Sequence, residues 1–230
     1  WQRISANTFL GIARSLFNWV TLEGQKLMGV GTHLKFYVEK GGDYSDITPE
    51  RTPSGVSLTD PFTTVSGSTT VTVTDAAGGY INGDFVTFSG ASAVGGLTLN
   101  GEFQLTYSIG NTYTIEASSA ASSSATGGGS VTAKYQINVG PEFAVPLVGW
   151  GAGGWNTGTW GNGTTSTDSL RLWSQSNFGE DLIFGPRGGA VYYFDASGGL
   201  TTRAVALSTL AGASNTPTKQ NFILVSDVSR

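Results

Sequence analysis

The sequence predicts an all-β protein in which propeller-like blades, built as antiparallel meanders, are interrupted by an inserted small β-sandwich or barrel domain. Glycine accounts for 34 of the 230 residues, roughly double its average frequency. Charged residues make up only 12% of the chain, about half the usual share. Short runs with apolar residues at alternate positions are separated by glycine-rich turns, a pattern typical of strands and hairpins.

The first blade-like part is expected over residues 1–61. Its apolar runs are Leu16–Val20, Lys26–Gly31 and Leu34–Val38. The breaks between them are short enough for hairpins, because glycine supplies the positive φ that tight turns need. The spacing therefore predicts an antiparallel meander of three or four strands.

The same order of features returns in residues 139–230, the second blade-like part. A strand with Trp19 or Trp173 comes first, an apolar strand closing on Gly31 or Gly185 follows, and an aromatic strand leads to a Gly-Gly turn. This order indicates an internal repeat with one blade in each copy. The run Phe222–Val225 is expected to open a third copy, and the chain, which begins at Trp1, is expected to be a fragment of a longer polypeptide.

The insertion is expected over residues 62–138. Its period-2 runs predict about six strands, and regular spacing with turn signals favours a small sandwich or barrel. The clearest of these runs are Thr69–Thr74, Asp84–Phe88, Glu102–Tyr107, Asn111–Glu116 and Ser130–Ile137.

Charge and composition exclude several functions. The net charge of −4 comes with no basic patch, so the chain is expected to meet DNA only as passing cargo. The absence of cysteine excludes disulfides, thiolate metal sites and a cysteine nucleophile. No run of 18 apolar residues occurs, so no membrane-spanning segment is expected. No cofactor is predicted.

No catalytic or metal-binding residues are predicted either. His33 is the only histidine and lies in a turn, where a structural role is the usual one. The acidic pairs Asp43 and Asp46, Asp84 and Glu102, and Glu180 and Asp181 keep a polysaccharide-degrading enzyme open as a remote alternative. Acidic residues beside glycine in turns more commonly bond their own backbone. The run 43–46 lacks the glycine and distal glutamate of a calcium loop.

Three tryptophans recur every five residues among glycines, at Trp150, Trp155 and Trp160. Flat aromatic side chains of this kind stack on sugars or insert into a partner surface, so these residues are the candidate interaction site. The alternative interpretation is a long loop whose tryptophans anchor it to its own domain or to a neighbouring subunit. The second interpretation is favoured here.

Several motifs give the chain a family resemblance. The stretch Gly29–Tyr37 followed by Asp46–Arg51, together with Gly83–Gly90, Asn111–Ile115 and Gly127–Thr132, resembles a pattern in large virion proteins of podovirus-like phages. Such proteins are similar to tail nozzle or tubular tail proteins, in which a propeller carries inserted β domains.

The resemblance implies a subunit of a virion tail that forms a ring with copies of itself around the DNA conduit. Its other expected partners are the adaptor, the portal and the fibres. It implies no catalytic residues. A head or tail fibre module that recognises host surface glycans is the alternative.

Overall fold

A computed structural model describes residues 7–51, 53–77, 80–140 and 172–226 of the chain. Within these residues the fold is all-β, and the only helical element is the short 3-10 turn η1 (Leu207–Thr209). The prediction of an all-β protein is therefore confirmed. The chain divides into two compact units: unit 1 comprises residues 1–48 and 139–230, and unit 2 comprises residues 49–138.

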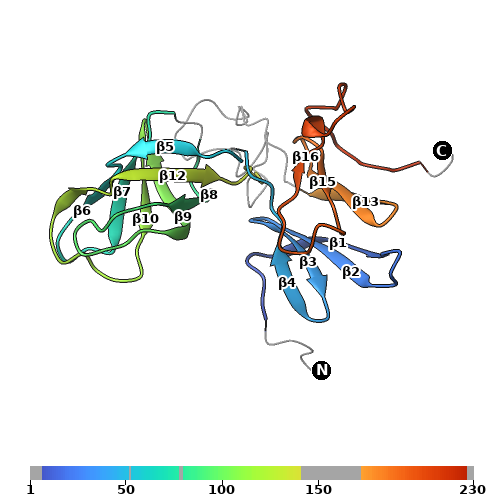
Figure 1. Cartoon of the computed structure of the whole chain (residues 1–230), viewed down its shortest axis with the longest axis horizontal. Helices are drawn as coiled ribbons and strands as arrows, with labels where there is room; N and C mark the ends of the chain where they lie inside the picture. The colour runs from blue at the N-terminus through green and yellow to red at the C-terminus, as the bar shows by residue number, and fades with distance from the viewer. Residues whose placement is uncertain (1–6, 52, 78–79, 141–171, 227–230) are drawn as a thin grey trace, which may run out of the picture. The chain divides into compact units, whose positions relative to one another are not determined.

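Unit 1 contains two four-stranded antiparallel sheets, and in each the strands pair in chain order (Figure 1). Meander I consists of β1 (Ala13–Val20), β2 (Lys26–Thr32), β3 (Phe36–Lys40) and β4 (Asp43–Asp46). Meander II consists of β13 (Trp173–Phe178), β14 (Asp181–Pro186), β15 (Tyr192–Phe194) and β16 (Val205–Ala206). The predicted strand order of both blade-like parts is thus observed.

The two meanders pack face to face through an aromatic core. Phe36 of β3 stacks on Phe184 of β14 with ring centroids 4.0 Å apart, and Trp173 meets Phe36 edge-on at 4.9 Å. All three side chains are buried. Close approach is possible because β2 presents Gly29 to Gln175 and Gly31 to Trp173, so no side chain separates the two sheets at these points.

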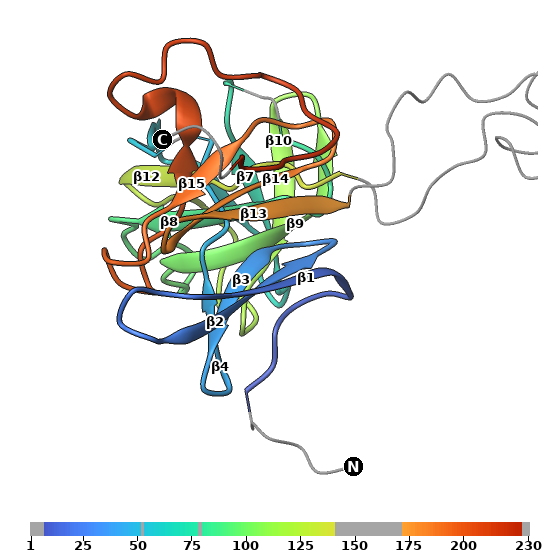
Figure 2. The ribbon, with the colours of Figure 1, turned by 90° about the vertical axis from the view of Figure 1, so that its right-hand side faces the viewer.

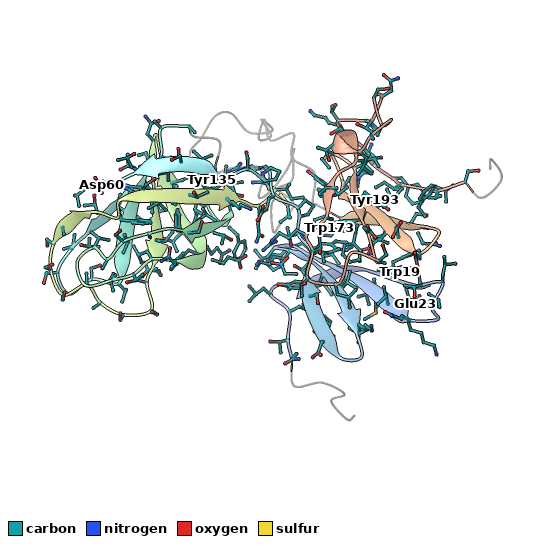
Figure 3. All side chains as sticks on the ribbon, viewed as in Figure 1. Trp19, Glu23, Asp60, Tyr135, Trp173 and Tyr193 are labelled. Carbon is teal, nitrogen blue, oxygen red and sulfur yellow. The ribbon has the colours of Figure 1, made fainter. Side chains whose placement is uncertain are left out.

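The two tryptophans hold the meanders together from opposite sides. The indole N–H of Trp19 donates to the Glu180 carbonyl of meander II over 2.8 Å, and that of Trp173 donates to the Thr32 carbonyl of meander I over 2.6 Å. Figure 3 labels both side chains. They are not equivalent positions of a repeat, because Trp19 pairs with Leu27 near the hairpin end of its strand whereas Trp173 pairs with Pro186 at the open end. The order of features along the sequence pairs Trp19 with Trp173, but the register of the strands does not.

Replacing Gly31 by alanine is expected to destabilise unit 1 by about 1–3 kcal/mol, because a new methyl group would overlap the Trp173 ring in a packed core. The matched control is Gly198→Ala, where an added Cβ meets nothing closer than 3.6 Å. Denaturant unfolding followed by tryptophan fluorescence measures both. Equal stability of the two variants would contradict the close packing of β2 on Trp173.

A partly buried ion cluster joins the end of β4 to the segment before β16. The Lys35 ammonium lies 2.7 Å from Asp46 Oδ2, and the Arg203 guanidinium reaches both carboxylate oxygens at 3.3 Å. Thr48 Oγ1 donates to Asp46 Oδ1, and Arg203 donates to the Thr48 carbonyl. Burial alone would raise the pKa of Asp46, but Arg203, Lys35 and these hydrogen bonds outweigh it and hold the pKa below 3.8. The cluster thus holds residues 46–48, at the end of β4, against the Arg203 segment of meander II.

Unit 2 is a nearly closed, barrel-like antiparallel sheet whose strand order is β11-β6-β7-β10-β9-β8-β12-β5. Its strands are β5 (Val56–Thr59), β6 (Phe62–Thr64), β7 (Thr70–Thr74), β8 (Phe85–Ser89), β9 (Gly101–Ile109), β10 (Thr112–Glu116), β11 (Ala125–Gly127) and β12 (Ser130–Tyr135). Alternate residues of these strands fill one core, which includes Phe62, Val73, Phe88, Leu105 and Val131. The five longest of these strands correspond to the predicted period-2 runs.

The barrel bends where its two end pairs meet. Strands β5 and β6 follow each other along the chain, as do β11 and β12, so the pairs β5–β12 and β6–β11 form one bent ribbon. At the bend Asp60 adopts φ 47°, beside Gly128 at φ 117°. Asp60 tolerates this conformation because its backbone and carboxylate both bond Gly129 at 2.8 Å. Figure 3 labels Asp60 at this corner.

The two ends of unit 2 are hydrogen-bonded to each other. The amide of Ile137 donates to the Pro49 carbonyl, the amide of Arg51 donates to the Tyr135 carbonyl, and Glu50 forms a β-bridge with Gln136. Strand β5 pairs with β12 although it precedes residue 62, where the sequence placed the start of the insertion. The chain therefore enters and leaves unit 2 at neighbouring positions.

Candidate interaction surface on unit 1

A groove of about 370 Å³ runs along the outer edges of β1 and β13. Each of these strands pairs on one side only within the part of the chain that the structure describes. The two strands are neighbours in the same unit, and Figure 2 shows β13 crossing the view above β1. The lining comprises Ser15, Leu16, Phe17, Leu172, Trp173, Ser174, Gln175, Arg187, Asn221 and Phe222.

The groove is apolar at its rim and neutral along most of its length. Leu16, Leu172 and Phe222 are 63%, 42% and 74% exposed, and Arg187 is the single charged residue in the lining. Exposed apolar side chains that lie close together on a folded domain commonly mark an interaction site. The composition suits contact with a protein surface better than binding of an anion or a metal ion.

The segment 220–225 passes over the face of meander II that points away from meander I. The Ile223 amide donates to Ser174 Oγ at 2.8 Å, and the Val225 amide donates to Ser176 Oγ at 3.2 Å. Gln220 bonds the turn after β14 through its backbone and its side chain. This run forms no strand within the described residues, so the strand expected to open a third copy is present only as a chain that lies against β13.

The sequence identified the run Phe222–Val225 but not the other residues of this surface. Leu16 and Leu172 belong to predicted strands, and period 2 alone does not tell which face of a strand remains uncovered. Trp150, Trp155 and Trp160, which the sequence offered as a possible interaction site, lie outside the described residues.

The acidic pairs considered for catalysis all make bonds within the fold. Asp46 belongs to the ion cluster, and Asp43 accepts a hydrogen bond from Asn7. Asp181 accepts hydrogen bonds from the Tyr193 hydroxyl at 2.5 Å and from the Ala196 amide, and the Tyr193 pKa is raised by the first of these bonds. Glu180 accepts from the Leu22 amide at 3.4 Å.

The third pair lies in unit 2. Asp84 is buried, accepts from Asn138 and the Ile81 amide, and lies 3.5 Å from Arg51. Glu102 accepts a 2.6 Å hydrogen bond from Gln136. His33 Nδ1 accepts from the Ile12 amide at 3.0 Å, so its observed role is to hold the segment before β1.

A buried tyrosine network closes one part of the unit 2 core. Tyr135 donates to Asp75 Oδ2 at 2.6 Å, and because its only proton is used there, Tyr113 donates to Tyr135 at 2.8 Å. Tyr80 donates to the Asp75 carbonyl, and the Arg51 guanidinium lies 5.1 Å from the centre of the Tyr135 ring. Burial raises the pKa of both Tyr113 and Tyr135 above 10, so both hydroxyls stay protonated.

Replacing Tyr135 by phenylalanine is expected to destabilise unit 2 by about 1–3 kcal/mol, because the buried Asp75 carboxylate and the Tyr113 hydroxyl each lose a partner. Hydrogen exchange of the β10 and β12 amides measures the change in unit 2 directly. Tyr107→Phe is the control, since Tyr107 is 54% exposed. Unchanged protection in the Tyr135 variant would show that the network contributes nothing to stability.

Among the described residues there is no group of three or more histidine or acidic side chains placed to hold a metal ion. No helix in the same residues has the length and apolar character needed to cross a membrane.

No protein-family model matches the chain, and no curated protein does. Among solved structures, the chain is similar to "Phage phi92 endosialidase", with 16% identity and a TM-score of 0.31. The similarity covers 85% of this chain and 29% of that one, so the chain spans less than a third of that protein's length. A similarity of this size supports no assignment of activity.

Proposed function

We propose that the chain is a structural component of a tailed-phage virion, acting as a ring-forming subunit of the tail nozzle or tube around the path of the DNA. The observation that carries the proposal is a stacking pattern that occurs twice in unit 1. Strand β13 lies on one face of meander I, and the segment 220–225 lies on the corresponding face of meander II.

The two stacking steps use similar contacts: a glutamine side chain lies at a glycine of the second strand, and serine hydroxyls of the first strand accept hydrogen bonds. In the first step Gln175 and Trp173 cover Gly29 and Gly31 of the second strand, and Gln175 bonds Ser15 Oγ of the first strand. In the second step Gly185 of the second strand lies against the Ala190 carbonyl and the Gln220 side-chain amide, and the chain that follows Gln220 donates hydrogen bonds to serine hydroxyls of the first strand. Radially repeated four-stranded meanders are the building principle of a propeller, so this pattern supports propeller-like blades with unit 2 as the inserted module.

The chemistry of the described residues also supports a structural role. The carboxylates considered for hydrolysis are bonded to neighbouring groups of the fold, and the tyrosine network is sealed from solvent. A low charge density with a net charge of −4 suits a wall past which DNA moves without being held.

An antibody raised against the chain tests the proposal on intact particles of the phage that encodes it. The expected result is labelling at the tail, below the junction with the head, in electron micrographs. Labelling confined to the fibres would favour the fibre alternative over the nozzle. Absence of labelling on both intact and disrupted particles would overturn a role in the virion.

A further inference from the structure

We infer that two exposed faces of unit 1 bind each other between copies of this chain, so that the stacking of meanders continues from one copy to the next. The trailing face is the outer face of β1, with Leu16 and Val20. The leading face is the outer face of segment 221–226, with Phe222 and Leu224. The inference rests on the proposed function, since it supplies the contact from which a ring of identical subunits would be built.

The trailing face follows from the alternation of β1 after its bulge near Arg14. Ser15 and Trp19 point toward meander II, where their side chains bond Gln175 and Glu180. Leu16 and Val20 therefore point the opposite way and are 63% and 55% exposed. Asn18 lies between them on β1, and Lys26 of β2 lies opposite Val20 at one end of this face.

The leading face follows from the same alternation in segment 221–226. Ile223 is buried, and its amide bonds Ser174 of meander II. Phe222 and Leu224, on the opposite side, are 74% and 77% exposed. An extended segment with apolar residues on both sides is typical of a strand that is covered on both faces. No described residue covers the leading face, which is a surface of the kind that another sheet covers.

The internal packing of unit 1 identifies the partner. The same contact occurs at each step of the stack. The first strand of the later sheet packs with its trailing side on the leading side of the preceding meander. Gln175 and Trp173 do this for β13, and Ile223 does it for the segment that follows. One trailing side, that of β1, and one leading side, that of segment 221–226, have no such partner among the described residues. A second copy that places its β1 on 221–226 repeats the step.

Because the two faces differ, the contact is heterologous, and such contacts close into rings when the rotation between subunits allows it. A contact between identical faces would stop at a dimer. This difference in symmetry makes the inference testable with mixed variants.

The experiment uses the full chain and two double variants. Leu16→Glu with Val20→Glu alters the trailing face, and Phe222→Glu with Leu224→Glu alters the leading face. Analytical ultracentrifugation is expected to show concentration-dependent association of the unaltered chain and a dissociation constant raised more than about tenfold for each variant alone. Mixed in equal amounts, the two variants are expected to form a dimer, because each retains one intact face, and to form nothing larger.

Val65→Glu with Ile109→Glu is the matched control, because both side chains are exposed in unit 2 and lie on neither face. It is expected to associate like the unaltered chain. Tryptophan fluorescence checks folding, and Leu16→Lys and Leu224→Lys replace any double variant that does not fold.

Three results would overturn the inference. These are an unaltered chain that stays monomeric at high concentration, variants that do not dimerise when mixed, and a control that loses association as well. None of them bears on labelling of the virion, so a failure of this contact and a failure of the proposed function are distinguishable.

Discussion

Replacing Asp46 by alanine is expected to lower the free energy of unfolding of unit 1 by about 3–5 kcal/mol, because breaking a buried ion pair from one side leaves an uncompensated charge. The charge in question is the Lys35 ammonium, whose side chain is only 3% exposed and lies 2.7 Å from the Asp46 carboxylate. Arg203 and Thr48 lose the same partner.

Tryptophan fluorescence reports this change selectively, since residues 49–138 contain no tryptophan and the described tryptophans, Trp19 and Trp173, lie in unit 1. Asp43→Ala is the control, because Asp43 lies at the exposed start of the same strand. An equal decrease in the free energy of unfolding for both variants would show that the ion cluster does not stabilise β4.

The pH dependence of stability provides a separate prediction for Asp46. Its pKa is lower in the folded chain than the value of about 3.9 expected in the unfolded chain. Its contribution is therefore fully present above the unfolded pKa and is lost as the pH falls through the folded pKa. The stability difference between the unaltered chain and Asp46→Ala is expected to be constant near neutral pH and to shrink below about pH 4. Fluorescence-detected unfolding at a series of pH values measures it, and a constant difference down to pH 2 would contradict the lowered pKa.

Replacing Phe184 by alanine is expected to cost about 3–5 kcal/mol, because the ring is fully buried and the resulting cavity lies between two sheets that cannot close over it. Phe184 contacts Phe36, Trp173 and Tyr192, so its loss affects both meanders. Phe178→Ala, on the preceding strand, removes a ring that is 58% exposed and is expected to change stability little. Urea unfolding followed by tryptophan fluorescence compares the two, and similar midpoints would show that the meanders do not share a core.

Local sequence patterns predicted much of the fold, because alternation and glycine turns act over a few residues. The hairpins around Gly24, Gly179 and Gly188 are examples in which a glycine at positive φ closes the turn. The short strands β6, β11 and β16 escaped prediction because two or three residues are too few to show a period. Residue order also paired Trp19 with Trp173, although register separates them, because only a structure fixes which residues face each other.

The candidate surface was harder to predict than the fold. Leu16 and Val20 alternate with Ser15 and Trp19 as in any half-buried strand, and the sequence does not tell which side is covered. Phe222–Val225 gave a clearer signal, because apolar residues at consecutive positions suggest a strand with two covered faces. The carboxylates were interpreted as turn residues, whereas the partly buried Asp46 and the buried Asp84 are paired with cationic side chains from other segments.

The bonded ends of unit 2 have an evolutionary consequence. Pro49 and Ile137 are hydrogen-bonded, so a host fold has to open at a single point to accept the whole module, and the module brings its own core. Recombination at such a point can exchange, duplicate or delete the barrel while the host sheets keep their pairing. We therefore expect related chains to differ most by the presence and identity of this module, and least in the sheets that carry it.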